Sequence, residues 1–442
     1  METVALYVLG VVIVTLGLAI SIALHELGHL VPAKLFGVRV GQYMIGFGRT
    51  LWSRRRGETE YGIKAIPLGG YISMAGMFPP LKPGGKARTA STGFFQTMVQ
   101  DARTVSADTV PEGEEHRTFY NLPVWKRVII MSGGPFMNLV IAVVLFGVVL
   151  SGLGVQQVST TIGSVSECLH PATSTETTCG PDDPVAPGAA GGILPGDRLV
   201  SIDGTPIADW AQATSIIQAS PARELAIVVE RDGDAVDVTA TPALTERYVY
   251  NPDGSIAKDA AGAPRTQKVG MLGVTAATEL VPQPVTAVLP AVGDNIVGVA
   301  NIILHLPQRL VDVAVAAFGP GERDPNGPMS VVGVGRIAGE ITSINTIPLA
   351  ERAAYLIGLV GSVNIALLVF NLIPLMPLDG GHIAGALWEG TRRFFAKLFR
   401  RPVPGPVDTA KVIPLTFAVV IVLGAMSLLL IYADIVKPVT LF

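Results

Sequence analysis

The residues His25-Glu26-Leu27-Gly28-His29 decide how this chain is interpreted, and they directly follow an uncharged apolar run, Ala5–Leu24. Residues four apart share one face of a helix, so His25 and His29 are expected to point the same way. Two imidazoles with this spacing can bind one Zn²⁺, with Glu26 beside them as a general base. Ionisable groups at the end of a membrane-length segment are costly and are functional by default. We therefore favour a metal site over a pair of histidines that merely end a helix.

The composition places the chain among multi-span membrane proteins. Of its 442 residues 49% are hydrophobic and 15% are charged, and the mean hydropathy is +0.49. This is too apolar for an ordinary soluble protein. The net charge is −3, so nothing suggests a nucleic-acid partner.

Four uncharged runs reach the ~20 residues that cross a bilayer. They are Ala5–Leu24, Val128–Leu150, Ala353–Leu378 and Val412–Ala433. A fifth apolar stretch, Ile296–Pro307, is shorter and continues into polar residues, so it is interpreted as an amphipathic surface helix. The first run is not preceded by basic residues and ends without a small-residue cleavage site, so it is expected to be a retained span.

Basic residues flanking the runs predict the orientation, because Lys and Arg collect in cytoplasmic loops. The stretch from Ser151 to Asp197 has no Lys or Arg, which predicts that the region after the second run lies outside the cell membrane, together with both termini. The two basic loops contain the residues Lys34, Arg39, Arg54, Arg55, Arg56, Lys126 and Arg127, and Arg392, Arg393, Lys397, Arg400, Arg401 and Lys411.

The expected fold is a polytopic α-helical membrane protein with four transmembrane helices, a membrane-associated β-hairpin and one extracytoplasmic PDZ-like α+β domain. The predicted segments are, in order, a first transmembrane helix (1–36), a cytoplasmic loop with the hairpin (37–126), a second transmembrane helix (127–152), an outer region with the PDZ domain (153–278), an outer amphipathic segment (279–350), a third transmembrane helix (351–384), a cytoplasmic loop (385–411) and a fourth transmembrane helix (412–434).

The first cytoplasmic loop holds the predicted hairpin, in which β-branched and aromatic residues surround the pair Gly69-Gly70. Its apolar character suggests contact with the membrane, although a plain cytosolic hairpin fits the sequence equally well. The following residues, 79–115, are rich in Pro, Gly, Ser, Thr and charge, and we expect a loop there.

A third metal ligand is expected at Asp379, because a catalytic zinc usually takes three protein ligands. Asp379 follows the third run as His25 follows the first, and both runs are expected to cross in the same direction, so both residues would lie toward the cytoplasmic leaflet. Prolines and glycines around Asp379 should unwind the helix. The alternatives are that Asp379-Gly380 only turns the chain, or that His382 is the ligand, which is the less common hydrolytic set.

The outer region contains the pattern of a small domain. A Pro195-Gly196-Asp197 corner leads into an alternating strand, a helical piece is predicted at Trp210–Gln218, and a hairpin turns at Asp232-Gly233. The pattern resembles a PDZ domain, which binds extended peptides or chain ends by strand addition, although a spacer without a ligand is also possible. Cys168 and Cys179 lie in one polar loop and could pair or remain free thiols.

Taken together, the chain resembles the site-2 protease family of intramembrane zinc metalloproteases, and most of all the bacterial branch that cleaves anti-sigma factors, in its actinobacterial form with one PDZ domain. The similarity covers nearly the whole chain. Its motifs are His25–His29, Pro67–Tyr71, Gly133–Asn138, the PDZ pattern, and Asn371 with Asp379-Gly380.

The resemblance implies Zn²⁺ on His25, His29 and Asp379, with Glu26 as the base. It implies that Asn371 helps to hold the substrate backbone. It also implies that the hairpin residues Gly69, Gly70, Tyr71 and Ile72 pair with an unwound substrate strand. The implied partners are the lipid bilayer, a single-span membrane substrate of the anti-sigma type, and a peptide tail at the PDZ domain.

Two further asparagines lie in or near the matching motifs. Relatives often have a second Asn about one turn before the position of Asn371, whereas here the nearest is Asn364, seven residues earlier. Asn138 is interpreted as forming a helix–helix hydrogen bond. Two other functional classes remain: an inactive membrane scaffold or receptor with a peptide-binding PDZ domain, and a metal transporter, which would need polar residues along the spans rather than at one depth.

Overall fold

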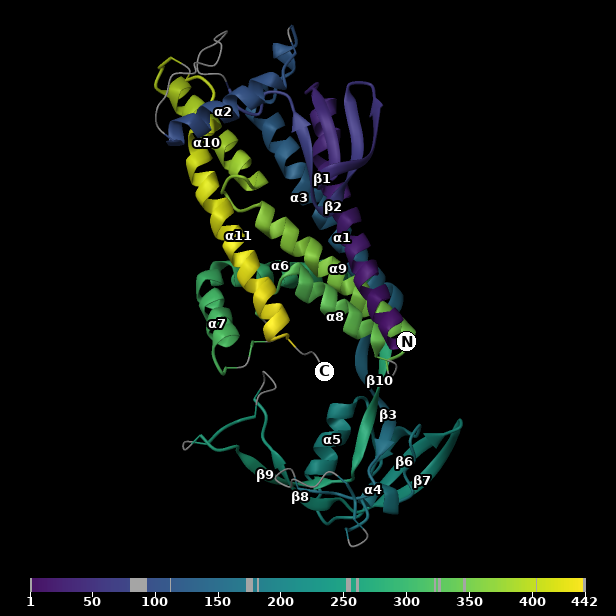
Figure 1. Cartoon of the computed structure of the whole chain (residues 1–442). Coiled ribbons are helices and arrows are strands. Elements are labelled where there is room, and N and C mark those ends of the chain that lie inside the picture. The colour runs from purple at the N-terminus through teal and green to yellow at the C-terminus, as the bar shows by residue number, and fades with distance from the viewer. Residues whose placement is uncertain are drawn as a thin grey trace. The chain divides into compact units, whose positions relative to one another are not determined.

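The computed structural model describes residues 2–79, 94–111, 113–171, 178–180, 183–251, 256–259, 262–321, 323–324, 327–344, 347–402 and 404–439. The chain divides into two compact units (Figure 1). One contains Met1–Leu153 and Gln283–Phe442, and the other is Gly154–Pro282. Each unit is described by itself below.

Five helical segments in the described residues are long and apolar enough to cross a membrane. Four contain the predicted apolar runs, at least in large part: α1 (Glu2–Leu35), α3 (Val124–Gly147, continued by a π-helical segment Val148–Leu153), α9 (Leu349–Asn371) and α11 (Ile413–Val436). The fifth is Val285–Leu304, which includes α6 (Val288–Leu304).

The predicted surface helix at Ile296–Pro307 is therefore wrong in its bounds. The helix begins eleven residues earlier, at the 3₁₀ turn Val285–Ala287, because Asp294 and Asn295 interrupt the apolar pattern without ending the helix. It ends at Leu304, and the polar residues that the prediction joined to it belong to a separate helix, α7 (Leu306–Phe318).

Contacts among the long helices fix their directions. Gly17 of α1 packs against Val360 of α9, and one turn further along both helices Asn364 donates a hydrogen bond to Ser21 Oγ over 2.9 Å. Positions in α1 and α9 rise together, so these helices run parallel. α3 runs antiparallel to α1, because His25 faces Asn138 while His29 faces Ile130.

α6, α7 and α8 (Val331–Ser343) connect the second unit to α9 and pack within the first. Thr342, in the last turn of α8, donates a hydrogen bond to the Leu6 carbonyl near the start of α1. α7 packs against the last turns of α11, where Phe318 stacks on Tyr432. The chain thus enters α9 at the end of the bundle where α1 begins.

The β structure after α1 consists of two long bent strands, β1 (Val40–Arg56) and β2 (Thr59–Met74). Tyr43 pairs with Tyr61 on one side and with Ile72 on the other, while Arg54 also pairs with Tyr61. The two strands therefore make four adjacent stretches, in the order 70–74, 40–47, 59–66 and 50–56. Among the described residues, stretch 70–74 is an edge of this sheet.

The chain reverses at Gly57-Glu58 and again between Ile66 and Gly70, where the hairpin was predicted to turn. Positions 42–45 rise together with 60–63 but run against 70–73, so β2 turns back on itself near Gly69, which has a φ of 121°. Residues 79–115, expected to be a loop, contain the helix α2 (Phe94–Asp108), while 80–93 and 112 lie outside the described residues. The predicted cytoplasmic loop 385–411 likewise contains most of the helix α10 (Asp379–Leu398).

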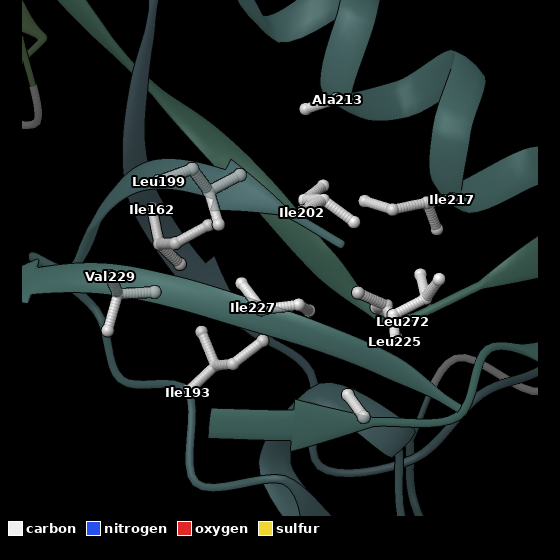
Figure 2. Packing of buried hydrophobic residues seen from close by; sticks show 11 residues of the cluster. Ile162, Ile193, Leu199, Ile202, Ala213, Ile217, Leu225, Ile227, Val229 and Leu272 are labelled. Atoms are coloured by element: carbon white, nitrogen blue, oxygen red, sulfur yellow. The ribbon is translucent and has the colours of Figure 1, made fainter. Parts of the chain in front are cut away.

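The second unit is an α+β domain with a sheet in the order β10-β3-β4-β6-β7, with β5 paired to β4. Figure 2 shows its core, in which Ile202, Ile227 and Leu225 lie between the sheet and the helix α5. The elements are β3 (Val155–Val165), α4 (Pro187–Ala190), β4 (Arg198–Ile202), β5 (Thr205–Pro206), α5 (Trp210–Gln218), β6 (Leu225–Arg231), β7 (Asp234–Ala240) and β10 (Val274–Val281), with a separate hairpin of β8 (Ala243–Tyr248) and β9 (Thr266–Met271).

Two features of the sequence explain this domain. The predicted hairpin turn has positive φ at Asp232 and Gly233, as a two-residue turn of this type requires. The Asp197 carboxylate, 1% exposed, accepts two hydrogen bonds from the Arg231 guanidinium and one from the Leu194 amide. The Arg231 hydrogen bonds lower the pKa of Asp197. The contact therefore stabilises the domain fully above the ordinary pKa of the carboxyl, and this stabilisation is lost as the pH falls through the lowered pKa.

Cys168 and Cys179 form a disulfide. The two alternatives that the sequence left open are thereby decided in favour of pairing.

Candidate metal centre

Three side chains from two distant segments meet in the first unit. Nε2 of His25 and Nε2 of His29 are 3.2 Å apart, and Oδ2 of Asp379 lies 3.3 Å from each of them. His25 and His29 are buried, and the Asp379 side chain is 18% exposed. The spacing of four residues in α1 and the break before α10 thus produce one compact cluster.

The cluster has the chemistry and dimensions of a zinc site. Zinc bonds of about 2.0–2.1 Å in a tetrahedron place neighbouring ligand atoms ~3.3–3.4 Å apart, which is the spacing of these three atoms. Oδ2 of Asp379 is buried and has no hydrogen-bonding partner among the described residues, which an oxygen facing a cation would explain. These three residues are one of the groups in the described part of the chain that could hold a metal ion. The other such group contains Cys168 and Cys179, which are joined in the disulfide.

The helix α3 holds both imidazoles from behind. The Ile130 carbonyl lies 2.7 Å from Nδ1 of His29, and a carbonyl can only accept, so the His29 proton is on Nδ1 and the lone pair of Nε2 faces the cluster. The Asn138 amide lies 3.1 Å from Nδ1 of His25. Outer partners of this kind fix the orientation and tautomer of ligating histidines.

Three glycines allow α3 to approach α1 this closely. A Cβ on Gly134 would lie 2.3 Å from Nε2 of His29 and 2.6 Å from Nε2 of His25. A Cβ on Gly28 would meet the Gly133 carbonyl at 2.2 Å, and a Cβ on Gly133 would meet the Gly28 carbonyl at 2.0 Å. Any larger residue at these positions forces the helices apart or displaces the rings.

Asp379 reaches the histidines because α9 ends early. Its last residue is Asn371, and the chain then turns through Pro374 and Pro377 before α10 begins at Asp379. A buried ion pair between Arg127 of α3 and Glu389 of α10, 2.6 Å long, ties α10 to the helix that supports the imidazoles. The same helix therefore positions both halves of the cluster.

His382, the rival ligand, lies outside the cluster. It is one turn after Asp379, and its ring packs edge-on against Phe119 at 6.4 Å between centroids. Among the described residues, the carboxylate of Asp379 and not the imidazole of His382 joins the two histidines.

Of the remaining candidate residues, Glu26 and Gly70 lie beside this cluster. Glu26 is next to His25 on α1 and is partly buried, and a Cβ on Gly70 would lie 2.9 Å from its Cγ. The edge stretch of β2 thus passes beside Glu26 at Gly70. Asn371 is partly exposed at the end of α9.

Sequence reasoning missed the supporting residues. Asn138 does bond between helices, as expected, but its partner is a cluster histidine. The roles of the Ile130 carbonyl and of the Arg127–Glu389 pair have no sequence signal of their own, because an apolar residue's carbonyl and a pair 262 positions apart follow no local motif. Gly133-Gly134 did carry a signal, since two adjacent glycines in a membrane helix indicate close packing.

Comparison with known proteins identifies the family of this chain. The model of peptidase family M50 matches residues 13–401. The chain is 34% identical over 460 residues to zinc metalloprotease Rip1 of Mycobacterium tuberculosis, covering 99% of this chain and 100% of the relative. It is 34% identical to zinc metalloprotease Rip1 of Mycolicibacterium smegmatis (98% and 99%), and 28% identical to metalloprotease MmpA of Caulobacter vibrioides (85% of each). The chain therefore belongs to peptidase family M50, the site-2 protease family.

Proposed function

We propose that this membrane zinc metalloprotease holds its metal with His25, His29 and Asp379, uses Glu26 as the general base, and cleaves a single-span protein within the bilayer. The family and the zinc metalloprotease relatives support the enzyme class, zinc endopeptidase, over nearly the whole chain. The observation that carries the residue assignment is the triangle of three ligand atoms with edges of 3.2–3.3 Å.

The chemistry follows from the residue types. The zinc ion that His25, His29 and Asp379 would hold would lower the pKa of a bound water toward ~7 and would polarise a carbonyl. Glu26 is placed beside the ligands to take the water's proton and to pass it to the leaving amine. Asn371, at the end of α9, donates a hydrogen bond to the developing oxyanion or to the substrate strand, an interaction that is typically worth ~3 kcal/mol.

Replacing Asn371 with Leu is then expected to lower kcat, and an unchanged kcat would remove it from the mechanism.

The substrate must be extended at the site, because a helix hides its carbonyls. The edge stretch 70–74 of β2 is suited to pair with such a segment, since its other side is already paired with β1 and it passes Glu26 at Gly70. Strand addition supplies the main-chain hydrogen bonds that the substrate loses on unwinding. Gly69, Gly70, Tyr71 and Ile72 are the residues we assign to this role.

Replacing Gly70 with Val tests this assignment. The new side chain would collide with Glu26 and Ile22, where a Cβ alone already lies 2.9 and 3.0 Å from their atoms. We expect cleavage to fall by at least about 100-fold while zinc is retained, because none of the three ligands is changed. Gly57→Val is the matched control, since a Cβ on Gly57 meets nothing within 4 Å, although its φ of 64° lowers stability somewhat. Normal cleavage by the Gly70 variant would contradict the role of the edge stretch.

The proposed topology has four crossings. α1 and α9 run parallel, so an odd number of crossings lies between them. α3 provides one, and the chain from α6 to α8 begins and ends at the same end of the bundle, where α7 and α8, of 13 residues each, are too short to return across the ~20-residue span. We therefore assign α6 to the bundle's margin. Charge asymmetry and the disulfide favour an outer location for the PDZ-like unit and for both termini. Cysteine labelling from outside the cell would contradict this orientation if it modified residues of the basic loops.

The substrate class follows from the depth of the site. A bond next to α1 in the lipid is reached only by a membrane-embedded chain, and we propose a single-span protein of the anti-sigma type whose outer domain has been removed. The PDZ-like unit on the outer side would bind or exclude a peptide tail by strand addition.

Sequencing of protein termini in membranes tests the function as a whole. Cells that lack this chain are compared with cells that express it. We expect membrane stubs of single-span proteins to accumulate without the chain, and new termini inside transmembrane segments to appear with it. New termini confined to soluble domains, or an identical set of termini in both membranes, would contradict an intramembrane protease.

A further inference from the structure

Asn138 is a buried polar residue that the mechanism above does not use. It lies on α3, is fully buried, and its Nδ2 is 3.1 Å from Nδ1 of His25. Its other amide atom, Oδ1, is buried without a hydrogen-bonding partner among the described residues. A buried amide oxygen without a partner is costly, so this arrangement needs an explanation.

The two orientations of the amide correspond to two states of His25. With Nδ2 toward the ring, Nδ1 must accept, so the imidazole proton lies on Nε2 and that nitrogen cannot bind a metal. A half-turn of the amide places Oδ1 against Nδ1. Nδ1 then carries the proton and donates it, and the lone pair of Nε2 is free to face Asp379 and His29.

His29 shows which state a ligand requires. Its Nδ1 donates to the Ile130 carbonyl over 2.7 Å, and a carbonyl permits only that tautomer. In the part of the chain that the structure describes, no main-chain carbonyl contacts Nδ1 of His25, and the Asn138 side chain lies there instead. α3 thus faces both ligands with a possible acceptor, one main-chain and one side-chain.

We propose that Asn138 is a positioning residue for the metal: its amide oxygen accepts the Nδ1 proton of His25 and selects the tautomer in which Nε2 binds zinc. The inference rests on the proposed zinc site and adds to it a determinant of metal affinity. Outer hydrogen-bond partners of this kind typically change metal affinity by ~10–100-fold.

The chain offers a matched control in Asn364. It is also fully buried, and also bonds from another helix to α1, where it donates to Ser21 Oγ one turn before His25. Its Oδ1 likewise lacks a partner among the described residues. Loss of either amide therefore removes a buried polar group between α1 and a neighbour, but only Asn138 touches a ligand.

The experiment measures the zinc dissociation constant of the full chain in nanodiscs by competition with a chelator, together with the melting temperature. Four proteins are compared: the wild type, Asn138→Leu, Asn138→Asp and Asn364→Leu. We expect Asn138→Leu to bind zinc about 10–100-fold more weakly, because Leu has a similar volume and no acceptor. Asn138→Asp should stay within about threefold of the wild type, since a carboxylate also accepts from Nδ1. Asn364→Leu should do the same, whatever its melting temperature.

The possible outcomes distinguish a failure of the proposed zinc site from a failure of the proposed role of Asn138. If the wild type binds no zinc, the proposed site itself fails. If the wild type binds zinc and Asn138→Leu binds it equally well, only the role of Asn138 fails. The role also fails if Asn364→Leu loses as much affinity as Asn138→Leu, or if Asn138→Asp is as weak as Asn138→Leu, since neither result would depend on an acceptor at Nδ1.

Discussion

Glu26→Gln is expected to abolish cleavage of a membrane substrate while leaving one zinc per chain. The amide has nearly the same shape as the carboxylate but cannot take a proton from water, so the rate should fall by the ~10²–10⁴-fold that a general base contributes. Glu26 is not among the three residues whose ligand atoms converge, so the metal should remain. The measurement is the rate of substrate loss in cells or nanodiscs, with zinc determined on the same protein.

A suitable control is a Glu→Gln substitution in the same unit but away from the site. Glu114 pairs with Arg39 at 2.8 Å between the end of α1 and the segment before α3, and Glu114→Gln should leave cleavage within about twofold. Cleavage at the normal rate by the Glu26 variant would rule out its role as base, even if zinc were present. Loss of zinc from that variant would instead show that Glu26 is needed to hold the metal ion.

Asp379→Asn is the second change with a large expected effect. It replaces the anionic oxygen that lies 3.3 Å from both imidazoles by a neutral amide. A direct ligand should matter more than an outer partner, so zinc affinity should fall by more than ~100-fold and cleavage should cease. Asp434→Asn is the matched control: Asp434 is also buried near the end of a membrane helix, but it bonds to Arg323 and Ser330, far from the histidines in the fold. It should lower stability and retain zinc.

The ligands could be found from the sequence because their signals are local. The i, i+4 spacing of His25 and His29 fixes their common face without knowledge of any other helix. Asp379 needed one further step, namely that two apolar runs crossing in the same direction place their ends at one depth. The parallel contacts of α1 and α9 at Gly17–Val360 and Ser21–Asn364 show the physical basis of that step.

The rest of the site depends on packing that a pattern does not encode. The support from α3 follows from the crossing at Gly28 and Gly133, which decides that Ile130 and Asn138, rather than their neighbours, face the rings. The Gly69-Gly70 pair indicated the reversal of β2, but the crossing of β2 from one side of stretch 40–47 to the other follows no local pattern. The predicted helix at Ile296–Pro307 began too late, because the apolar pattern is interrupted at Asp294. A helix can continue through one polar turn, as α6 does.

The central claim, that segments 350 residues apart share one metal ion, is tested most directly by the zinc content of the purified chain and of its Asp379→Asn variant. One zinc per wild-type chain is expected, and less than about a tenth of that in Asp379→Asn after dialysis against a weak chelator, with Asp434→Asn unchanged. A wild type without zinc, or an Asp379→Asn chain that keeps the full wild-type content, would contradict the account.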